Sequence, residues 1–175
     1  MEDITIAAAE KLGLRISSIK EFLYLHPEYN REIVFLIDMR IASGKNRFFV
    51  CNLKTGNIID QGLVAHGIGS ETGNSELQFS NVNNSYSTAL GKYSIGQHYN
   101  GKFGKAYKLH GLDETNSNAF LRNIVLHKLD TMPHEEQEEK ICNSQGCPMV
   151  SERFFSRIEK IIDGSEKPII MAIYY

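Results

Sequence analysis

The sequence lacks three features that would assign it to a broad class of protein. It has no basic excess, because 19 Lys and Arg stand against 21 Asp and Glu with a net charge of −2, and its scattered cations do not indicate nucleic-acid binding. It has no apolar run near the roughly 20 residues that span a bilayer. The acidic start at residues 1–4 and the short alanine run at 7–9 do not form a signal peptide. The sequence alone does not decide between a cytoplasmic protein and one whose export signal has been removed.

Cysteine is also scarce. The three cysteines, Cys51, Cys142 and Cys147, are an odd number, so at least one thiol is free of any intramolecular disulfide. Cys142 and Cys147 lie five residues apart, without the CxxC spacing of a redox or zinc motif. Cys51 shares a strand face with Phe49 and Leu53, which indicates core packing. The cysteines therefore do not form a disulfide framework.

The length of 175 residues, with 42% hydrophobic residues, is typical of one globular domain. We expect residues 1–31 to form an N-terminal helical arm. Ser18 and Glu21 fit a capping box at a helix start, and Pro27 stops the apolar run that follows. Residues 32–175 then form the main domain.

This main domain is predicted to be rich in strands. A loop rich in Gly, Ser and Asn covers residues 67–86, and a loop of this length is often functional. The acidic run 134–139 predicts a solvated short helix or a lid. Ser151 is expected to cap a helix that ends at Gly164. Short apolar runs predict strands at 33–37, 47–53, 58–59, 63–66, 93–95, 106–110, 124–127 and 168–174. The fold class is therefore mainly β (α+β), with one packed helix near the end.

The most informative motif is Ser144-Gln145-Gly146-Cys147-Pro148. A small polar turn is an unusual place for a packing cysteine, since free cysteines otherwise behave as small buried hydrophobes. His127 closes an apolar run upstream and offers a base that titrates near neutral pH. A thiol and a base are the minimum apparatus for acyl transfer through a thioester. The alternatives are a buried structural thiol and an ordinary histidine at a strand end.

Several segments in order resemble the murein branch of the L,D-transpeptidase catalytic domains, over residues 32–175. The similarity implies a mostly β, sandwich-like fold that carries a histidine and a cysteine at one end of its sheets. It is carried by Val64-Ala65-His66-Gly67-Ile68-Gly69-Ser70, Phe79-Ser80-Asn81, Ser87-Thr88-Ala89-Leu90-Gly91-Lys92-Tyr93, Tyr107-Lys108-Leu109-His110-Gly111-Leu112, Asn118-Ala119, Arg122-Asn123-Ile124-Val125-Leu126-His127 and the cysteine motif.

One part of the motif departs from the better-known branch of that family. That branch reads Ser-His-Gly-Cys followed by an apolar residue and an arginine. Here Gln145 replaces the histidine, and Pro148 and Met149 follow the cysteine. The murein branch commonly reads S-x-G-C-P, so the nucleophile is retained, whereas the group that holds the substrate carboxylate is not identified.

The resemblance implies a reaction on bacterial peptidoglycan in the cell envelope (periplasm), although this chain shows no export signal. A cysteine thiolate would attack the carbonyl of the third, diamino-acid residue of a stem peptide and release the terminal D-alanine. Transfer to the side-chain amine of another stem would give a 3→3 cross-link, and transfer to water would be carboxypeptidase action. No cofactor, metal, nucleic acid or membrane span is implied, and the oligomeric state is unknown.

The resemblance also assigns roles to individual residues. Cys147 would be the nucleophile, and His127 the base and later the acid. A carbonyl near Ser144 would orient the histidine, and backbone N–H groups at Gly146 and Cys147 would stabilise the oxyanion.

Four further residues are candidates for binding the substrate. Arg122 could hold a stem carboxylate by a bidentate contact, or it could be a surface cation. His110 would line the cleft or close a strand. His66 and Gly91 are expected to shape the rim of the site.

Three other functions are alternatives to this one. A zinc hydrolase would need three ligands from among His66, His110, His127 and Cys142, but no HxxxH or CxxC spacing supports it. A papain-like peptidase is disfavoured because its nucleophile precedes its histidine in the chain. A non-catalytic cell-wall-binding module that keeps the fold remains an alternative.

Overall fold

Apolar strands that are covered on both faces form the centre of the fold. The computed structural model describes residues 6–175, so the acidic start at residues 1–4 lies outside the described part. Within it, the helices are α1 (Ile6–Leu25) and α2 (Glu152–Asp163), and two short 3₁₀ turns are η1 (Ile68–Ser70) and η2 (Glu114–Asn116). The strands are β1 (Ile33–Asp38), β2 (Phe48–Asn52), β3 (Ile58–Gly62), β4 (Val64–Ala65), β5 (Gly91–Gly101), β6 (Gly104–Gly111), β7 (Val125–Leu129), β8 (Met149–Ser151) and β9 (Ile170–Tyr174).

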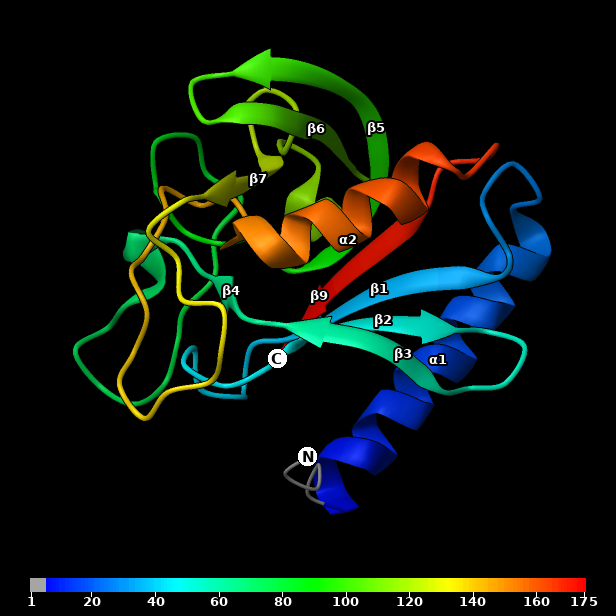
Figure 1. The fold of residues 1–175 in the computed structure, drawn as a ribbon, viewed down its shortest axis with the longest axis horizontal. Coiled ribbons are helices and arrows are strands. Elements are labelled where there is room, and N and C mark those ends of the chain that lie inside the picture. Colours follow the sequence, from blue (N-terminus) through cyan, green and yellow to red (C-terminus); the bar gives the residue numbers. More distant parts are fainter. Residues whose placement is uncertain (1–5) are drawn as a thin grey trace.

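These strands form one continuous sheet in the order β3-β2-β1-β9-β5-β6-β7-β8-β4. The pairs β1–β9 and β7–β8 are parallel, whereas β5 and β6 form a long antiparallel hairpin. The sheet curls, so that α2 lies between the β5–β7 part and the β1–β3 part (Figure 1). Neither described helix is both long and apolar enough to cross a membrane.

Alternate residues of the central strands face two separate cores. Phe35 and Ile37 of β1 pack with Phe154 and Phe155 of α2 in the larger core. Their neighbours in β1 face the opposite side, where α1 supplies its apolar stripe. Because both faces are covered, these strands read as continuous apolar runs rather than as alternating ones. The α1 core consists of Leu12, Ile16, Ile19, Leu23, Val34, Leu36, Phe49, Cys51, Leu53, Ile170, Ala172 and Tyr174.

Cys51 lies in this second core, which confirms its predicted packing role. Its side chain is fully buried, and burial raises its thiol pKa to about 12. The thiol is therefore neutral and inert at physiological pH.

The predicted capping box in the N-terminal arm is wrong. Ser18 lies inside α1, which runs from Ile6 to Leu25 without interruption. The apolar stripe of α1 extends far upstream of Ser18 and packs on the sheet, so tertiary burial outweighs the local start signal. The predicted stop is confirmed, because α1 ends two residues before Pro27. Arg31 donates to the carbonyls of Leu23 and Tyr24 in the last turn, at 3.2 Å each.

The second helix follows its predicted signals. Ser151 is the N-cap of α2, and its hydroxyl accepts a hydrogen bond from the Phe154 N–H at 3.3 Å. Gly164 follows the last turn, and its N–H donates to the Lys160 carbonyl at 3.1 Å.

The acidic run 134–139 contains no helix, which corrects that part of the prediction. Its backbone is held instead by the loop before β2. The Gln137 N–H donates to the Gly44 carbonyl at 2.9 Å, and Glu136 accepts from the Asn46 N–H at 2.7 Å. A helix would lose these contacts. Most of the run is exposed, in agreement with the solvated alternative.

Pairing of the last strands brings the two chemically important segments together. His127 of β7 is paired in register with Met149 of β8, two residues after Cys147, and with Ala106 of β6 on its other side. The mainly β fold with an N-terminal helix and one helix after the cysteine motif is thus confirmed.

Candidate active site

The Cys147 thiol lies half-buried on the turn that precedes β8. Its Sγ accepts a hydrogen bond from the Val125 N–H at 3.4 Å and donates to the Asn123 carbonyl at 3.6 Å. Burial raises the pKa of this thiol, while the Val125 N–H and the positive charge of Arg122 act in the opposite direction. The resting group is therefore a neutral thiol held by the backbone that leads into β7.

The turn around the thiol is closed by Ser144. Its hydroxyl donates to the Cys147 carbonyl at 2.6 Å and accepts from the Gly146 N–H at 3.2 Å. Gly146 has φ of +112°, and a Cβ there would approach the Ser87 carbonyl to 3.0 Å. This position therefore requires glycine.

One backbone N–H remains free in the turn that carries Cys147. No acceptor in residues 6–175 pairs with the Cys147 N–H, whereas the Gly146 N–H is bound to Ser144. Of the two N–H groups expected to stabilise an oxyanion, the one at Cys147 is thus available to a ligand.

His127 lies in β7 with only 7% of its surface exposed. Its Nδ1 is 3.0 Å from the Lys128 carbonyl, and because a carbonyl can only accept, Nδ1 carries the proton and Nε2 is the free base. The carbonyl that orients the ring is therefore that of Lys128. The resemblance implied a carbonyl near Ser144 in this role, but the carbonyl of Ser144 itself accepts from the Ile68 N–H at 2.8 Å.

The environment of this ring favours its neutral form. Burial lowers the pKa of His127, and the hydrogen bond to Lys128 only partly offsets this. The ring of Phe103 stacks on the imidazole, with centroids 5.1 Å apart and planes 16° apart.

His127 and Cys147 line the same cavity, which has a volume of about 620 Å³. Its walls come from the tip of the β5–β6 hairpin, from β7 and β8, from η1 and from the segment before the cysteine turn. No hydrogen bond within residues 6–175 joins the thiol to the imidazole. The other lining residues are Ile68, Tyr99, Gly101, Lys102, Phe103, Gly104, Ala106, Val125, Leu129, Thr131, Cys142, Asn143, Ser144, Gln145 and Met149.

Cys147 also borders a second hollow of about 190 Å³, which shares Gln145 with the large cavity. Its walls include Asn84, Tyr86 and Asn123, which are the non-glycine residues with positive φ in the described chain. Such conformations store strain and cluster at functional sites. The thiol therefore lies between two hollows, with the imidazole in the larger one.

Arg122 borders this smaller hollow, but its guanidinium is engaged by the chain. It donates to the Ser80 carbonyl at 3.0 Å, to the Ser87 carbonyl at 2.7 Å and to the Ser85 hydroxyl at 3.1 Å. These bonds hold the loop before β5 in place next to Gly146 of the Cys147 turn. Carboxylate binding by Arg122 stays a prediction, and its positive charge acts on the pKa of Cys147.

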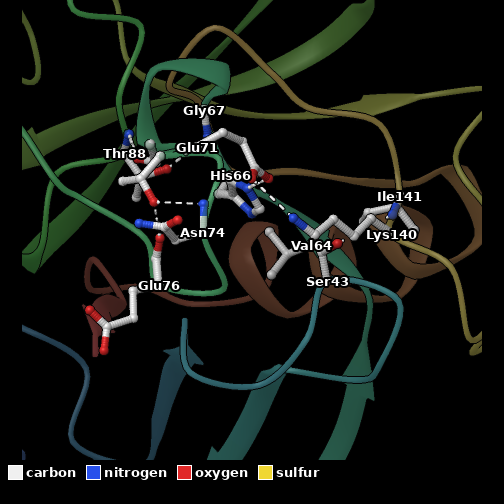
Figure 2. Close-up of polar contacts among 12 residues, drawn as sticks. Ser43, Val64, His66, Gly67, Glu71, Asn74, Glu76, Thr88, Lys140 and Ile141 are labelled. Atoms are coloured by element: carbon white, nitrogen blue, oxygen red, sulfur yellow. Dashed lines mark hydrogen bonds and ion pairs between the residues drawn. The ribbon is translucent and has the colours of Figure 1, made fainter.

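His66 is buried outside the large cavity and belongs to a polar network. Its Nδ1 is 2.8 Å from Nη2 of Arg47, and its Nε2 is 2.7 Å from Glu71 Oε1. Since Arg47 can only donate, His66 carries its proton on Nε2. Figure 2 shows Glu71 and Lys140 beside the ring. Burial is the main cause that lowers the pKa of His66.

This network supports the Cys147 turn through the backbone. The His66 carbonyl accepts from the Ser144 N–H at 2.9 Å, and the Ser144 carbonyl accepts from the Ile68 N–H. Gly67 lies directly against Gly146, because a Cβ on Gly67 would be 2.8 Å from the Gly146 Cα. His66 therefore directly precedes Gly67, which pairs with Ser144 in an isolated parallel β-bridge.

The other two predicted binding residues lie away from the large cavity. His110 is exposed and stacks on Phe120 with centroids 5.2 Å apart. Gly91 has φ of +131° and lies against Asp113 and Asn116 at the start of β5. Neither lines the cavity that contains Cys147 and His127.

Sequence reasoning missed the wall formed by Tyr99, Lys102 and Phe103. Glycines at 101 and 104 mark the turn, but only the pairing of β6 with β7 brings its tip over His127. No cluster of three or more possible metal ligands occurs within residues 6–175.

Comparisons with known proteins identify the family of the chain. No curated protein matches the chain in a sequence search. A solved structure of Ldtfm as its avibactam carbamoyl enzyme is 11% identical, with a TM-score of 0.49, and covers 83% of this chain and 50% of that chain. The chain thus spans about half the length of this structural neighbour. The profile of the L,D-transpeptidase catalytic domain matches residues 8–171, beginning inside α1 and including both His127 and Cys147. With nearly its whole length matched, the chain belongs to the L,D-transpeptidase catalytic domain family.

Proposed function

We propose that the protein is a cysteine acyltransferase that acts on peptidoglycan stem peptides in the bacterial cell envelope. The observation that carries the proposal is the shared cavity, into which a polar-turn thiol and an imidazole with a free Nε2 both open. Family membership supports the substrate class.

In the first half-reaction, Cys147 attacks the carbonyl of the third residue of a donor tetrapeptide. His127 Nε2 accepts the thiol proton as the C–S bond forms, which gives a tetrahedral oxyanion. Collapse breaks the C–N bond, and the protonated His127 returns its proton to the nitrogen of the departing D-alanine. A thioester between Cys147 and the stem remains.

The second half-reaction reverses these proton transfers. The side-chain amine of an acceptor stem attacks the thioester, and His127 removes a proton from its nitrogen. Collapse of the intermediate forms a 3→3 amide bond and expels the thiolate, which recovers its proton from His127. Water in place of the amine gives a free carboxylate, which is the carboxypeptidase outcome.

Two features of the chain support this sequence of steps. Burial shifts the pKa of Cys147 up and that of His127 down, so the pair is neutral at rest and the base is ready to accept a proton. The free Cys147 N–H points to an oxyanion donor, and removing such a donor costs on the order of 3 kcal/mol in other hydrolases.

The test is incubation of the protein with purified tetrapeptide muropeptides, followed by mass spectrometry of both products and protein. We expect release of D-alanine and a thioester adduct on Cys147, both abolished in Cys147→Ala and in His127→Ala. Cys142→Ser is the matched control, because it alters a second thiol in the same cavity and should retain turnover.

The products distinguish the two activities. Cross-linked dimers identify a transpeptidase, and tripeptide monomers alone identify a carboxypeptidase. A correctly folded protein that gives neither turnover nor adduct would contradict the proposal and favour a non-catalytic cell-wall-binding module.

A further inference from the structure

The large cavity carries an unbalanced positive charge. None of its lining residues is acidic, and Lys102 is the lining residue that carries an ammonium group, whereas burial lowers the pKa of His127 and favours its neutral form. In a partly enclosed space lined mainly by apolar and uncharged groups, a single cation attracts an anionic ligand group.

Lys102 occupies a defined place next to the catalytic pair. It lies at the tip of the β5–β6 hairpin, and its Nζ is 5.4 Å from the centroid of the Phe103 ring. The same Phe103 ring stacks on His127. The ammonium group is therefore one aromatic ring away from the imidazole that performs the proton transfers.

Two neighbouring cations, Lys105 and Lys128, are paired with carboxylates, unlike Lys102. Lys105 is bound to Asp163 and lies 3.3 Å from Glu159, and Lys128 lies 2.9 Å from Glu152. Within residues 6–175, Lys102 has no carboxylate partner. Its positive charge is thus available to a ligand in the cavity.

The other cation near the thiol is less available. The Arg122 guanidinium donates to two carbonyls and a hydroxyl, and Arg122 borders the smaller hollow rather than the large cavity. The position two residues after the cysteine, where the better-known branch has arginine, is Met149, which is buried.

We propose that Lys102 recognises a carboxylate of the donor stem and so determines substrate specificity. This proposal rests on the proposed function, because Lys102 can bind the donor stem only if that stem occupies the large cavity. The proposal concerns the two carboxylates nearest the reacting carbonyl: the terminal one of D-alanine, and the one on the side chain of the diamino acid. The shared chemistry is a carboxylate that meets an ammonium group at the hairpin tip.

The experiment combines one substitution with amidated substrates. Wild type, Lys102→Met and Lys108→Met are assayed on four synthetic tetrapeptides: unmodified, amidated at the C-terminus, amidated at the side-chain carboxyl, and amidated at both. Lys108 is the matched control, because its Nζ also lies over an aromatic ring, that of Tyr99 at 4.4 Å, but it does not line the cavity. Release of D-alanine or its amide gives kcat and KM.

We expect Lys102→Met to reduce kcat/KM on the unmodified peptide about fivefold to tenfold through KM, as for loss of a partly solvated charged contact. On the doubly amidated peptide, wild type and Lys102→Met should be equal. If one singly amidated peptide also makes wild type and Lys102→Met equal, the carboxylate that is amidated in that peptide is the one that Lys102 binds. Lys108→Met should follow wild type on all four.

Two results would overturn the assignment. Equal loss on all four peptides would mean that Lys102 acts only on the structure of the hairpin, and no loss on any of them would mean that it does not contact the substrate. Both leave the proposed function intact, since Cys147 acylation is still observed. If wild type acylates Cys147 with none of the peptides, the proposed function itself fails, and the role of Lys102 fails with it.

Discussion

Replacing Gly67 with alanine is expected to displace the turn that carries Cys147. The added Cβ would lie 2.1 Å from the Tyr86 carbonyl oxygen, 2.8 Å from the Gly146 Cα and 2.9 Å from the Gly146 nitrogen. Carbon contacts are ordinarily about 3.5–4.0 Å. Gly67 has φ of −69° and ψ of 142°, which alanine adopts freely, so the effect comes from space alone.

The expected magnitude follows from the atoms involved. All three are backbone atoms, which cannot rotate away as a side chain does, so η1 and the cysteine turn must separate. Overpacking of this kind costs about 1–3 kcal/mol. A displacement of about 1 Å at reacting groups can reduce a rate about 100-fold. We therefore expect both lower stability and slower chemistry at Cys147.

Two measurements on purified protein check this expectation. Urea unfolding gives the free energy of unfolding, and iodoacetamide labelling with peptide mapping gives the alkylation rate of Cys147 separately from that of the exposed Cys142. Gly13→Ala is the matched control. Gly13 lies within α1 with no atom within 4 Å of an added Cβ, so alanine should stabilise the protein by about 0.5–1 kcal/mol. If Gly67→Ala unfolds and alkylates like wild type, the close approach of η1 to the nucleophile turn is wrong.

Three further predictions concern stability and the turn. The pKa values of His66 and His127 are lowered from 6.5 in the native state. Below pH 6.5 the unfolded chain therefore binds more protons than the native state, and the free energy of unfolding should fall as pH drops from 7.5 to 5. Urea unfolding midpoints across this range test the prediction, and a flat profile would contradict it. Ser144→Ala removes a hydroxyl that is hydrogen-bonded to both the Cys147 carbonyl and the Gly146 N–H. It should lower the free energy of unfolding in urea by about 1–3 kcal/mol and slow the alkylation of Cys147. An unchanged alkylation rate would exclude a role of Ser144 in shaping the turn. Ser151→Ala removes the N-cap of α2 and should cost about 0.5–2 kcal/mol without changing that rate, and thermal melts with the same labelling assay separate the two effects.

The local signals in the sequence were strongest where burial and propensity agree. Apolar runs that face a core on both sides predicted the central strands, and Ser151 with Gly164 predicted α2, because capping and turn chemistry depend on neighbours in the chain. At Ser18 the two conflicted, and the long apolar stripe of α1 prevailed over the capping signal. The acidic run 134–139 took its shape from distant backbone atoms at Gly44 and Asn46, which no local pattern contains.

The sequence by itself determined which residues can do chemistry. A thiol in a polar Ser-Gln-Gly-Cys-Pro turn and a histidine at the end of an apolar run are properties of short segments, and their order matched the L,D-transpeptidase family. Only the tertiary structure decided what surrounds them. The Lys128 carbonyl fixes the His127 tautomer, and the ring of Phe103 stacks on the imidazole. Lys102 lines the same cavity. The hairpin tip reaches His127 because strand pairing joins segments that are far apart in the chain. Such contacts depend on register and sheet curvature, which arise from packing of the whole domain and not from any one segment.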